Sequence, residues 1–208
     1  MKTSIKEIFN QNPDLLNDYQ NFTILGKRGF GKSYFTKYLL EQLSKSKKQA
    51  ILITDINDEY SFRKGKTFVF YDLESFENHF DNEGLEPGSF YVFKSRNLEE
   101  YYELFEIVNE SEDILLVLEE ANITSTAYYL HPALKELVAL GRHNNLNYIA
   151  IARRPTEINN DLMSQSNFIV TTRQVIDNDL KTLQKFSSGF EFDNLRNLEI
   201  GEYFIIRV

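Results

Sequence analysis

The residues of this sequence most able to do chemistry lie at positions 26–33, which read GKRGFGKS. They fit the pattern G-x-x-x-x-G-K-[ST] in full. Glycines in such a loop let the backbone wrap closely around a polyphosphate, in conformations that a Cβ would forbid. The loop amides and the positive end of the following helix then face the anion. We therefore predict a nucleotide-phosphate site formed by Gly26, Lys27, Arg28, Gly29, Phe30, Gly31, Lys32, Ser33 and Tyr34.

Two side chains at the end of this loop have defined roles in that chemistry. Lys32 is placed to reach the β- and γ-phosphates, and the hydroxyl of Ser33 to ligate Mg²⁺. The surroundings agree, because residues 22–25 read as a short buried strand and residues 34–43 have apolar side chains at helical spacing. A chance match is expected in about one in a hundred random chains of this length. ATP with Mg²⁺ is the expected ligand.

A second chemical element is the apolar run at residues 114–118, which is followed by Glu119 and Glu120. A continuous apolar run predicts a fully buried central strand, with both carboxylates at its carboxyl end. In a P-loop enzyme, Glu119 would there hold Mg²⁺ through water, and Glu120 would orient and polarise the attacking water. A strand that simply leads into a charged turn is the alternative, and the position downstream of the P-loop favours catalysis.

Composition limits the class of protein. The 208 residues, 42% of them hydrophobic and 26% charged, suit one soluble globular domain over residues 1–208. There is no cysteine, which excludes disulfides and thiolate metal sites. No secretory signal and no transmembrane run of about 18 apolar residues is present, so a cytoplasmic protein is expected.

The formal net charge of -8 restricts how the chain could contact nucleic acid. Proteins that coat nucleic acid over a large area usually have a basic domain. Contacts would therefore come from a few local basic groups, which an oligomeric ring would repeat. Solubility alone is the other explanation of the acidity.

The elements that must position these groups alternate along the chain. Residues 1–20 read as a helical extension packed on the core, and residues 97–110 as a helix that buries Leu98, Tyr102, Phe105 and Val108. Further helices are expected at 131–142 and 178–186, and further strands at 50–55, 67–71, 90–93, 148–152, 168–172 and 203–206. This alternation predicts an α/β fold, with a mostly parallel central sheet flanked by helices on both faces.

Residues 140–156, LGRHNNLNYIAIARRPT, resemble the FtsK/HerA superfamily of P-loop ATPases, in which a "GR…G…I…TQRP" stretch follows the acidic strand. The spacing from Glu119 to Arg154 also fits, and the resemblance covers residues 22–173. It implies a RecA-like core. Within the superfamily, the short length resembles the genome-packaging ATPases of tailless internal-membrane viruses with double-jelly-roll capsids. That resemblance implies an ATP-hydrolysing double-stranded DNA translocase, a homo-oligomeric ring, a capsid vertex partner, and a place in the host cytoplasm or on the virion.

The chain departs from the superfamily at two positions. Glu119 stands where an aspartate is usual, and Arg153 stands where a glutamine sensor usually precedes Arg-Pro. A glutamine reads a γ-phosphate through neutral hydrogen bonds, whereas an arginine adds charge and five donors. Arg153 could therefore act as a finger or as a DNA contact.

In such rings one subunit's arginine completes its neighbour's site and can raise turnover by about 10³ to 10⁵. The candidates are Arg142, Arg153, Arg154 and Arg173, of which Arg142 and Arg173 are preferred. Salt bridges at strand ends are the alternative role for each arginine.

Contacts to double-stranded DNA would go to phosphates rather than bases. Lys94 and Arg96, just beyond the strand at 90–93, are the expected channel residues. Two other functions stay open: a cellular or plasmid HerA-like translocase, and an ATP-dependent assembly switch without motor activity, which Arg153 in place of glutamine motivates.

Overall fold

The computed structural model describes residues 4–187 and 192–208. In this part of the chain, eight strands form one sheet in the order β10-β9-β1-β8-β5-β2-β4-β3. All neighbouring strands are parallel except β10, which runs antiparallel to β9. The strands are β1 (Phe22–Leu25), β2 (Ala50–Thr54), β3 (Thr67–Phe70), β4 (Phe90–Phe93), β5 (Ile114–Leu118), β8 (Asn147–Ala152), β9 (Phe168–Thr171) and β10 (Phe204–Arg207). The predicted mostly parallel sheet is confirmed.

The inner strands form because their sequences are continuous apolar runs. Every residue of β1, β2, β4, β5, β8 and β9 is buried, as parallel strands covered on both faces require. Alternate side chains enter two separate cores. On β5, Leu116 and Leu118 belong to one core, whereas Leu115 and Val117 belong to the other.

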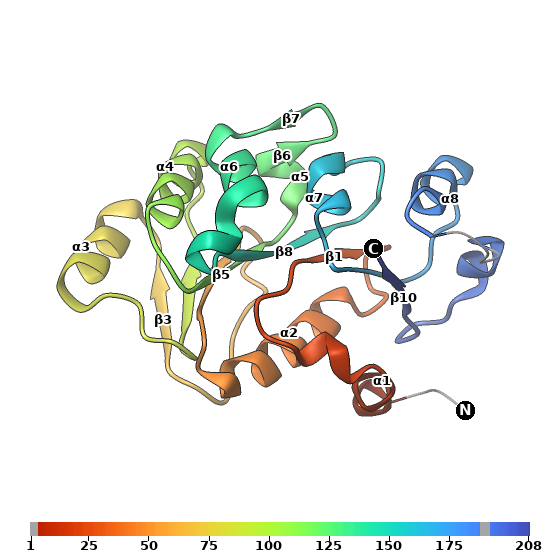
Figure 1. Ribbon diagram of the computed structural model, residues 1–208, viewed down its shortest axis with the longest axis horizontal. Helices are drawn as coiled ribbons and strands as arrows, with labels where there is room; N and C mark the ends of the chain where they lie inside the picture. Colours follow the sequence, from red (N-terminus) through yellow and green to blue (C-terminus); the bar gives the residue numbers. More distant parts are fainter. Residues whose placement is uncertain (1–3, 188–191) are drawn as a thin grey trace.

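Helices cover both faces of the sheet (Figure 1). One face carries α1 (Ile5–Gln11) and α2 (Lys32–Leu43). The other carries α3 (Leu73–Glu83), α4 (Leu98–Asn109), α6 (Pro132–Leu140), α7 (Asn160–Ser164) and α8 (Asp177–Gln184). Among residues 4–187 and 192–208, no helix has the length and apolar character needed to cross a membrane.

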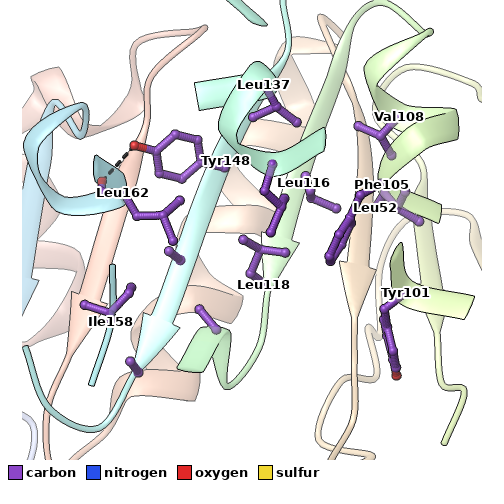
Figure 2. Close-up of a cluster of buried hydrophobic side chains, with 14 of the residues drawn as sticks. Leu52, Tyr101, Phe105, Val108, Leu116, Leu118, Leu137, Tyr148, Ile158 and Leu162 are labelled. Carbon is purple, nitrogen blue, oxygen red and sulfur yellow. Dashed lines mark hydrogen bonds between the residues drawn. The ribbon is translucent and has the colours of Figure 1, made fainter. Parts of the chain in front are cut away.

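The core on the α4 side joins distant parts of the sequence. Figure 2 shows Phe105 and Val108 of α4, Leu116 and Leu118 of β5, Leu137 of α6 and Tyr148 of β8 within one cluster. The buried Tyr148 hydroxyl donates to the carbonyl oxygen of Leu162 at 2.7 Å, which satisfies its polar end.

The inward face of α4 differs from the sequence prediction. Tyr101, Leu104, Phe105 and Val108 are buried, whereas Leu98 is 37% exposed. These buried positions follow the i, i+3, i+4, i+7 pattern of one helix face, so the stripe begins later than predicted. The prediction of Phe105 and Val108 as inward residues is confirmed, and that of Leu98 is wrong.

Several elements lack a counterpart among the predicted ones, including helix α7. Helix α3 has few apolar residues, and its start is set by Asp72, whose carboxylate accepts from the Ser75 amide at 2.8 Å. The short helix α5 (Ala121–Thr124) and a hairpin of β6 (Ser125–Thr126) and β7 (Tyr129–Leu130) follow the acidic strand.

Helix α1 is held on α2 by aromatic packing. Ser4 and Glu7 form a capping box at its start. The ring of Phe9 lies 5.1 Å from that of Phe35 and 4.9 Å from that of Tyr38. The N-terminal helix thus packs directly on the helix that follows the glycine-rich loop.

Candidate active site

The glycine-rich loop joins β1 to α2 at the carboxyl edge of the sheet. Gly26, Gly29 and Gly31 have φ angles of 140°, 81° and 101°, which L side chains rarely adopt. A Cβ on Gly26 would also lie 1.8 Å from Oγ1 of Thr172, and one on Gly31 would lie 2.6 Å from the Tyr203 hydroxyl. Both conformation and space therefore favour glycine at positions 26 and 31, and conformation alone favours it at position 29.

The strands β1, β8, β5 and β2 are neighbours, so the groups that follow them meet at one edge. They surround a cavity of about 500 Å³. Its lining contains predicted residues from three separate segments: Arg28, Gly29, Gly31, Lys32, Ser33, Tyr34, Glu119, Glu120 and Arg153. Asn57 and Glu59, which sequence reasoning missed, complete the lining.

Lys32 is one of the cations that line this cavity, together with Arg28 and Arg153. Its Nζ donates to the carbonyl oxygen of Gly26 at 2.7 Å. Burial lowers the pKa of Lys32, and the carboxylates of Glu119 and Glu120 oppose that shift. The side chain is therefore held across the loop with its charge facing two acids.

Glu119 is buried, with 4% of its surface exposed. Its Oε2 accepts a hydrogen bond from the Tyr60 hydroxyl at 2.8 Å. Burial raises the pKa of Glu119 to about 7, the Tyr60 hydrogen bond opposes this, and Glu59 and Glu120 add to it. A nearby cation would keep this carboxylate ionised.

Glu120 has a left-handed backbone, with φ 48° and ψ 53°. A non-glycine residue in this region is uncommon, and such strain clusters at functional sites. Its Oε1 accepts from Nε and Nη2 of Arg153 at 3.1 and 2.8 Å. The residue in the sensor position thus contacts the predicted catalytic carboxylate.

The other arginines have separate surroundings. Arg154 pairs with the buried Asp179 at 2.9 Å, so it has a structural partner. The guanidinium of Arg173, after β9, lies 5.9 Å from the ring centroid of Phe30 in the loop.

Arg142 is exposed and lies in a 3₁₀ helix, Gly141–Asn144, and two residues separate this helix from β8. The carbonyl oxygen of Asn144 accepts from the Asp113 amide at 2.9 Å, just before β5 begins. Since β5 and β8 are parallel, Arg142 lies at the amino edge of the sheet, opposite the glycine-rich loop of its own chain.

Of the predicted DNA contacts, Lys94 is engaged within the fold. Its side chain is 14% exposed, 3.8 Å from Asp55 and in an ion pair with Asp58. Arg96 is exposed.

The segment 55–60, after β2, supplies the site residues that the motifs did not identify. The buried carboxylate of Asp55 accepts from the amides of Glu59 and Tyr60, each at 2.8 Å. The Ser33 hydroxyl donates to Oε2 of Glu59 at 2.6 Å. The available signal was a buried strand that ends in the acidic run DINDEY at the same edge of the sheet as the glycine-rich loop.

The donors present fit Mg²⁺. Ser33 and Glu119 present oxygen atoms, the ligands that this hard cation prefers, and Glu59 accepts the hydrogen of the Ser33 hydroxyl. Within the described residues, no group of three or more His, Cys, Asp or Glu side chains is arranged to hold a metal alone. Mg²⁺ is usually bound by one or two protein groups together with substrate phosphates, which agrees with this arrangement.

The sequence model of the central domain of helicase HerA matches residues 17–203. The chain belongs to this family. The resemblance to the FtsK/HerA superfamily is thereby confirmed, and with it the P-loop ATPase fold. No curated protein matches this HerA-family chain.

Solved structures share the fold of this HerA-family chain. The genome packaging NTPase B204 from Sulfolobus turreted icosahedral virus 2, in complex with AMPPCP, has a TM-score of 0.75 at 21% identity, over 92% of this chain and 94% of that one. B204 from Sulfolobus turreted icosahedral virus, a DNA-packaging ATPase, gives 0.68 at 18% identity over 92% and 94%. VirB4 of Thermoanaerobacter pseudethanolicus gives 0.59 at 14% identity over 90% and 89%.

Proposed function

We propose that this protein is an ATP-hydrolysing double-stranded DNA translocase that packages a viral genome into a preformed capsid. The supporting observation is the single cavity that joins Lys32 and Ser33 of the loop to Glu119 and Glu120 of the acidic strand. B204, which is named for genome packaging, has the same fold over nearly the full length of both chains. In this proposal the protein works in the host cytoplasm or on the virion, docked on a capsid vertex protein.

The residues of the cavity divide the work of hydrolysis. The loop amides and Lys32 would bind the phosphates, whose negative charge replaces the Gly26 carbonyl as the partner of Lys32. Ser33 and Glu119 would hold Mg²⁺, which when bound neutralises charge on the phosphates. Glu120 would accept the hydrogen bond of the attacking water and take its proton. Arg153 holds one oxygen of Glu120 and leaves Oε2 for that water.

In a ring, an arginine from a neighbouring subunit would complete each nucleotide site. Arg142 lies at the edge opposite its own glycine-rich loop, so it could serve a nucleotide only on a neighbouring subunit. Arg173 lies beside its own loop. We therefore assign the trans finger to Arg142. DNA phosphates would contact exposed basic groups such as Arg96, whereas Lys94 first has to leave Asp58.

The first test is steady-state ATP hydrolysis against protein concentration, with and without double-stranded DNA, using Lys32→Ala as the blank. Turnover per subunit should rise with concentration, because the finger comes from a neighbour, and again with DNA. A flat rate that ignores DNA contradicts the translocase.

A second candidate is an ATP-dependent assembly switch, favoured by the ion pair between Arg153 and Glu120. If that pair persists with nucleotide bound, the catalytic carboxylate is restrained. A chain that stays monomeric in ATP and hydrolyses it slowly, without response to DNA, is the expected behaviour of the switch.

A related candidate is a cellular or plasmid translocase. The conjugation coupling protein TcpA of pCW3 shares the fold at a TM-score of 0.60 over 92% of this chain, but this chain covers only 58% of TcpA. Capsid genes beside the coding sequence would favour packaging, and conjugation or repair genes would favour this candidate.

A further inference from the structure

The hydroxyl of Ser33 is directed at a carboxylate that the motifs do not assign. Its hydrogen goes to Oε2 of Glu59, 2.6 Å away. The length is in the range of charge-assisted O–H···O⁻ bonds, which are roughly twice as strong as neutral ones. Glu119, the acid that the acidic strand supplies for metal binding, instead accepts from Tyr60.

The backbone of Glu59 is held in place at both its amide and its carbonyl group. Its amide donates to the buried Asp55 at 2.8 Å, and its carbonyl oxygen accepts from Nζ of Lys37 on α2. The next residue, Tyr60, is also anchored on Asp55 through its amide. The segment therefore links the end of β2 to the first turns of α2, with the Glu59 carboxylate facing the cavity.

The hydrogen-bonding capacity of a hydroxyl explains how this contact could affect metal binding. A serine hydroxyl has one hydrogen to donate and two lone pairs to offer. Once Glu59 takes the hydrogen, the rotation of the hydroxyl is set and its lone pairs are free for a cation. Without that acceptor the hydrogen can turn toward the cation site, where it is repelled.

We propose that Glu59 is the positioning residue that orients the Ser33 hydroxyl toward the Mg²⁺ accompanying the nucleotide. The proposal rests on the proposed nucleotide-dependent function and deepens it. The role is one of orientation, because Glu59 acts through Ser33. It predicts that loss of Glu59 weakens the Mg²⁺-dependent part of nucleotide binding and leaves the Mg²⁺-free part intact.

The experiment measures the affinity of a fluorescent, non-hydrolysable ATP analogue with Mg²⁺ and with a chelator. The chains are the wild type, Glu59→Ala, Ser33→Ala and the double variant. Glu59→Ala should lose about tenfold in affinity with Mg²⁺, the scale of coupling between contacting residues. With chelator its affinity should be unchanged or higher, because a negative charge near the phosphates has been removed. The double variant should match Ser33→Ala, since Glu59 has nothing left to orient.

Two further variants sharpen the result. Asp58→Asn removes the charge of an adjacent acid of the same segment, which pairs with Lys94 outside the Ser33 contact. Its φ of 56° is one that asparagine tolerates, so this variant should leave the Mg²⁺ dependence unchanged. Glu59→Gln keeps an oxygen that accepts the hydroxyl hydrogen, so it should restore most of that dependence.

Several outcomes would overturn the proposal. These are an unchanged Mg²⁺ dependence in Glu59→Ala, an equal loss with and without Mg²⁺, an additive loss in the double variant, or a Glu59→Gln chain that behaves like Glu59→Ala. A wild-type chain that binds the analogue no better than Lys32→Ala overturns the nucleotide-dependent function as well, so the two failures are distinguishable.

Discussion

Arg153 donates two hydrogen bonds, of 3.1 and 2.8 Å, to the same oxygen of Glu120. Glu120 accepts this pair while its backbone is in a left-handed conformation at the end of the central strand. Arg153, which stands where the superfamily usually has a neutral glutamine, therefore contacts the candidate catalytic base Glu120. The other carboxylate oxygen of Glu120, Oε2, is left for water.

Replacement of Arg153 tests whether this contact positions Glu120 or restrains it. We expect Arg153→Ala to lower turnover by about tenfold at saturating ATP, because the general base loses its orientation. Thermal stability should change little, since the Arg153 side chain is 52% exposed and exposed pairs contribute little. Arg153→Gln, the residue usual in the superfamily, should retain more activity. A rise in turnover in either variant would instead show restraint and favour the switch.

Glu120→Gln should bind ATP with nearly the wild-type affinity but hydrolyse it about 10² to 10⁴ times more slowly. The amide keeps the shape of the carboxylate and cannot take a proton from water. Nucleotide binding and single-turnover hydrolysis, measured on the same preparation, separate the two effects. Near-normal hydrolysis would remove Glu120 from its role.

The raised pKa of Glu119 predicts a pH-dependent stability in the nucleotide-free protein. Its carboxyl has a pKa of about 7 when folded, against 4.5 for an unperturbed glutamate, so the folded chain binds more protons between these values. The stability that the protonated Glu119 carboxyl contributes is fully present below its pKa in the unfolded chain. It is lost as the pH rises through its pKa of about 7 in the folded chain. Glu119→Gln has no carboxyl to ionise at this position, so it should not lose this stability. Above pH 7 its free energy of unfolding should exceed that of the wild type by up to about 3 kcal/mol.

Chemical unfolding across that pH range checks the Glu119 prediction. Glu136→Gln, an exposed substitution on α6, is the matched control and should follow the wild type. A stability difference between Glu119→Gln and the wild type that does not vary with pH would contradict the assignment.

Mixing experiments test Arg142 as the trans finger. Arg142→Ala should hydrolyse ATP about 10³-fold more slowly than the wild type while binding it normally. Mixed with Glu120→Gln, which keeps Arg142 but has an inactive site, it should regain part of the activity. Arg173→Ala serves as the control and should gain nothing from the mixture. Restoration in the Arg173→Ala mixture alone would move the finger to that residue.

Much of the fold could be predicted because each inner strand can be recognised from a few consecutive apolar residues. The runs at Phe22–Leu25, Phe90–Phe93 and Ile114–Leu118 are apolar throughout, and parallel strands buried on both faces require that pattern. Helix α3 was missed because its face toward the core is small, with Leu73 and Phe76 as its buried residues. On α4 the inward prediction is correct for Phe105 and Val108 and wrong for Leu98, because its apolar and aromatic residues offer more than one possible stripe.

The sequence by itself determined the phosphate loop and the acidic strand, since both are local patterns whose chemistry depends on neighbours within a few residues. Only the tertiary structure decided the partners across the sheet. Glu59 meets Ser33, 26 positions away, and Arg153 meets Glu120, 33 positions away, because the order of β1, β8, β5 and β2 brings their ends together. That order is set by the packing of the whole chain, which no local spacing encodes.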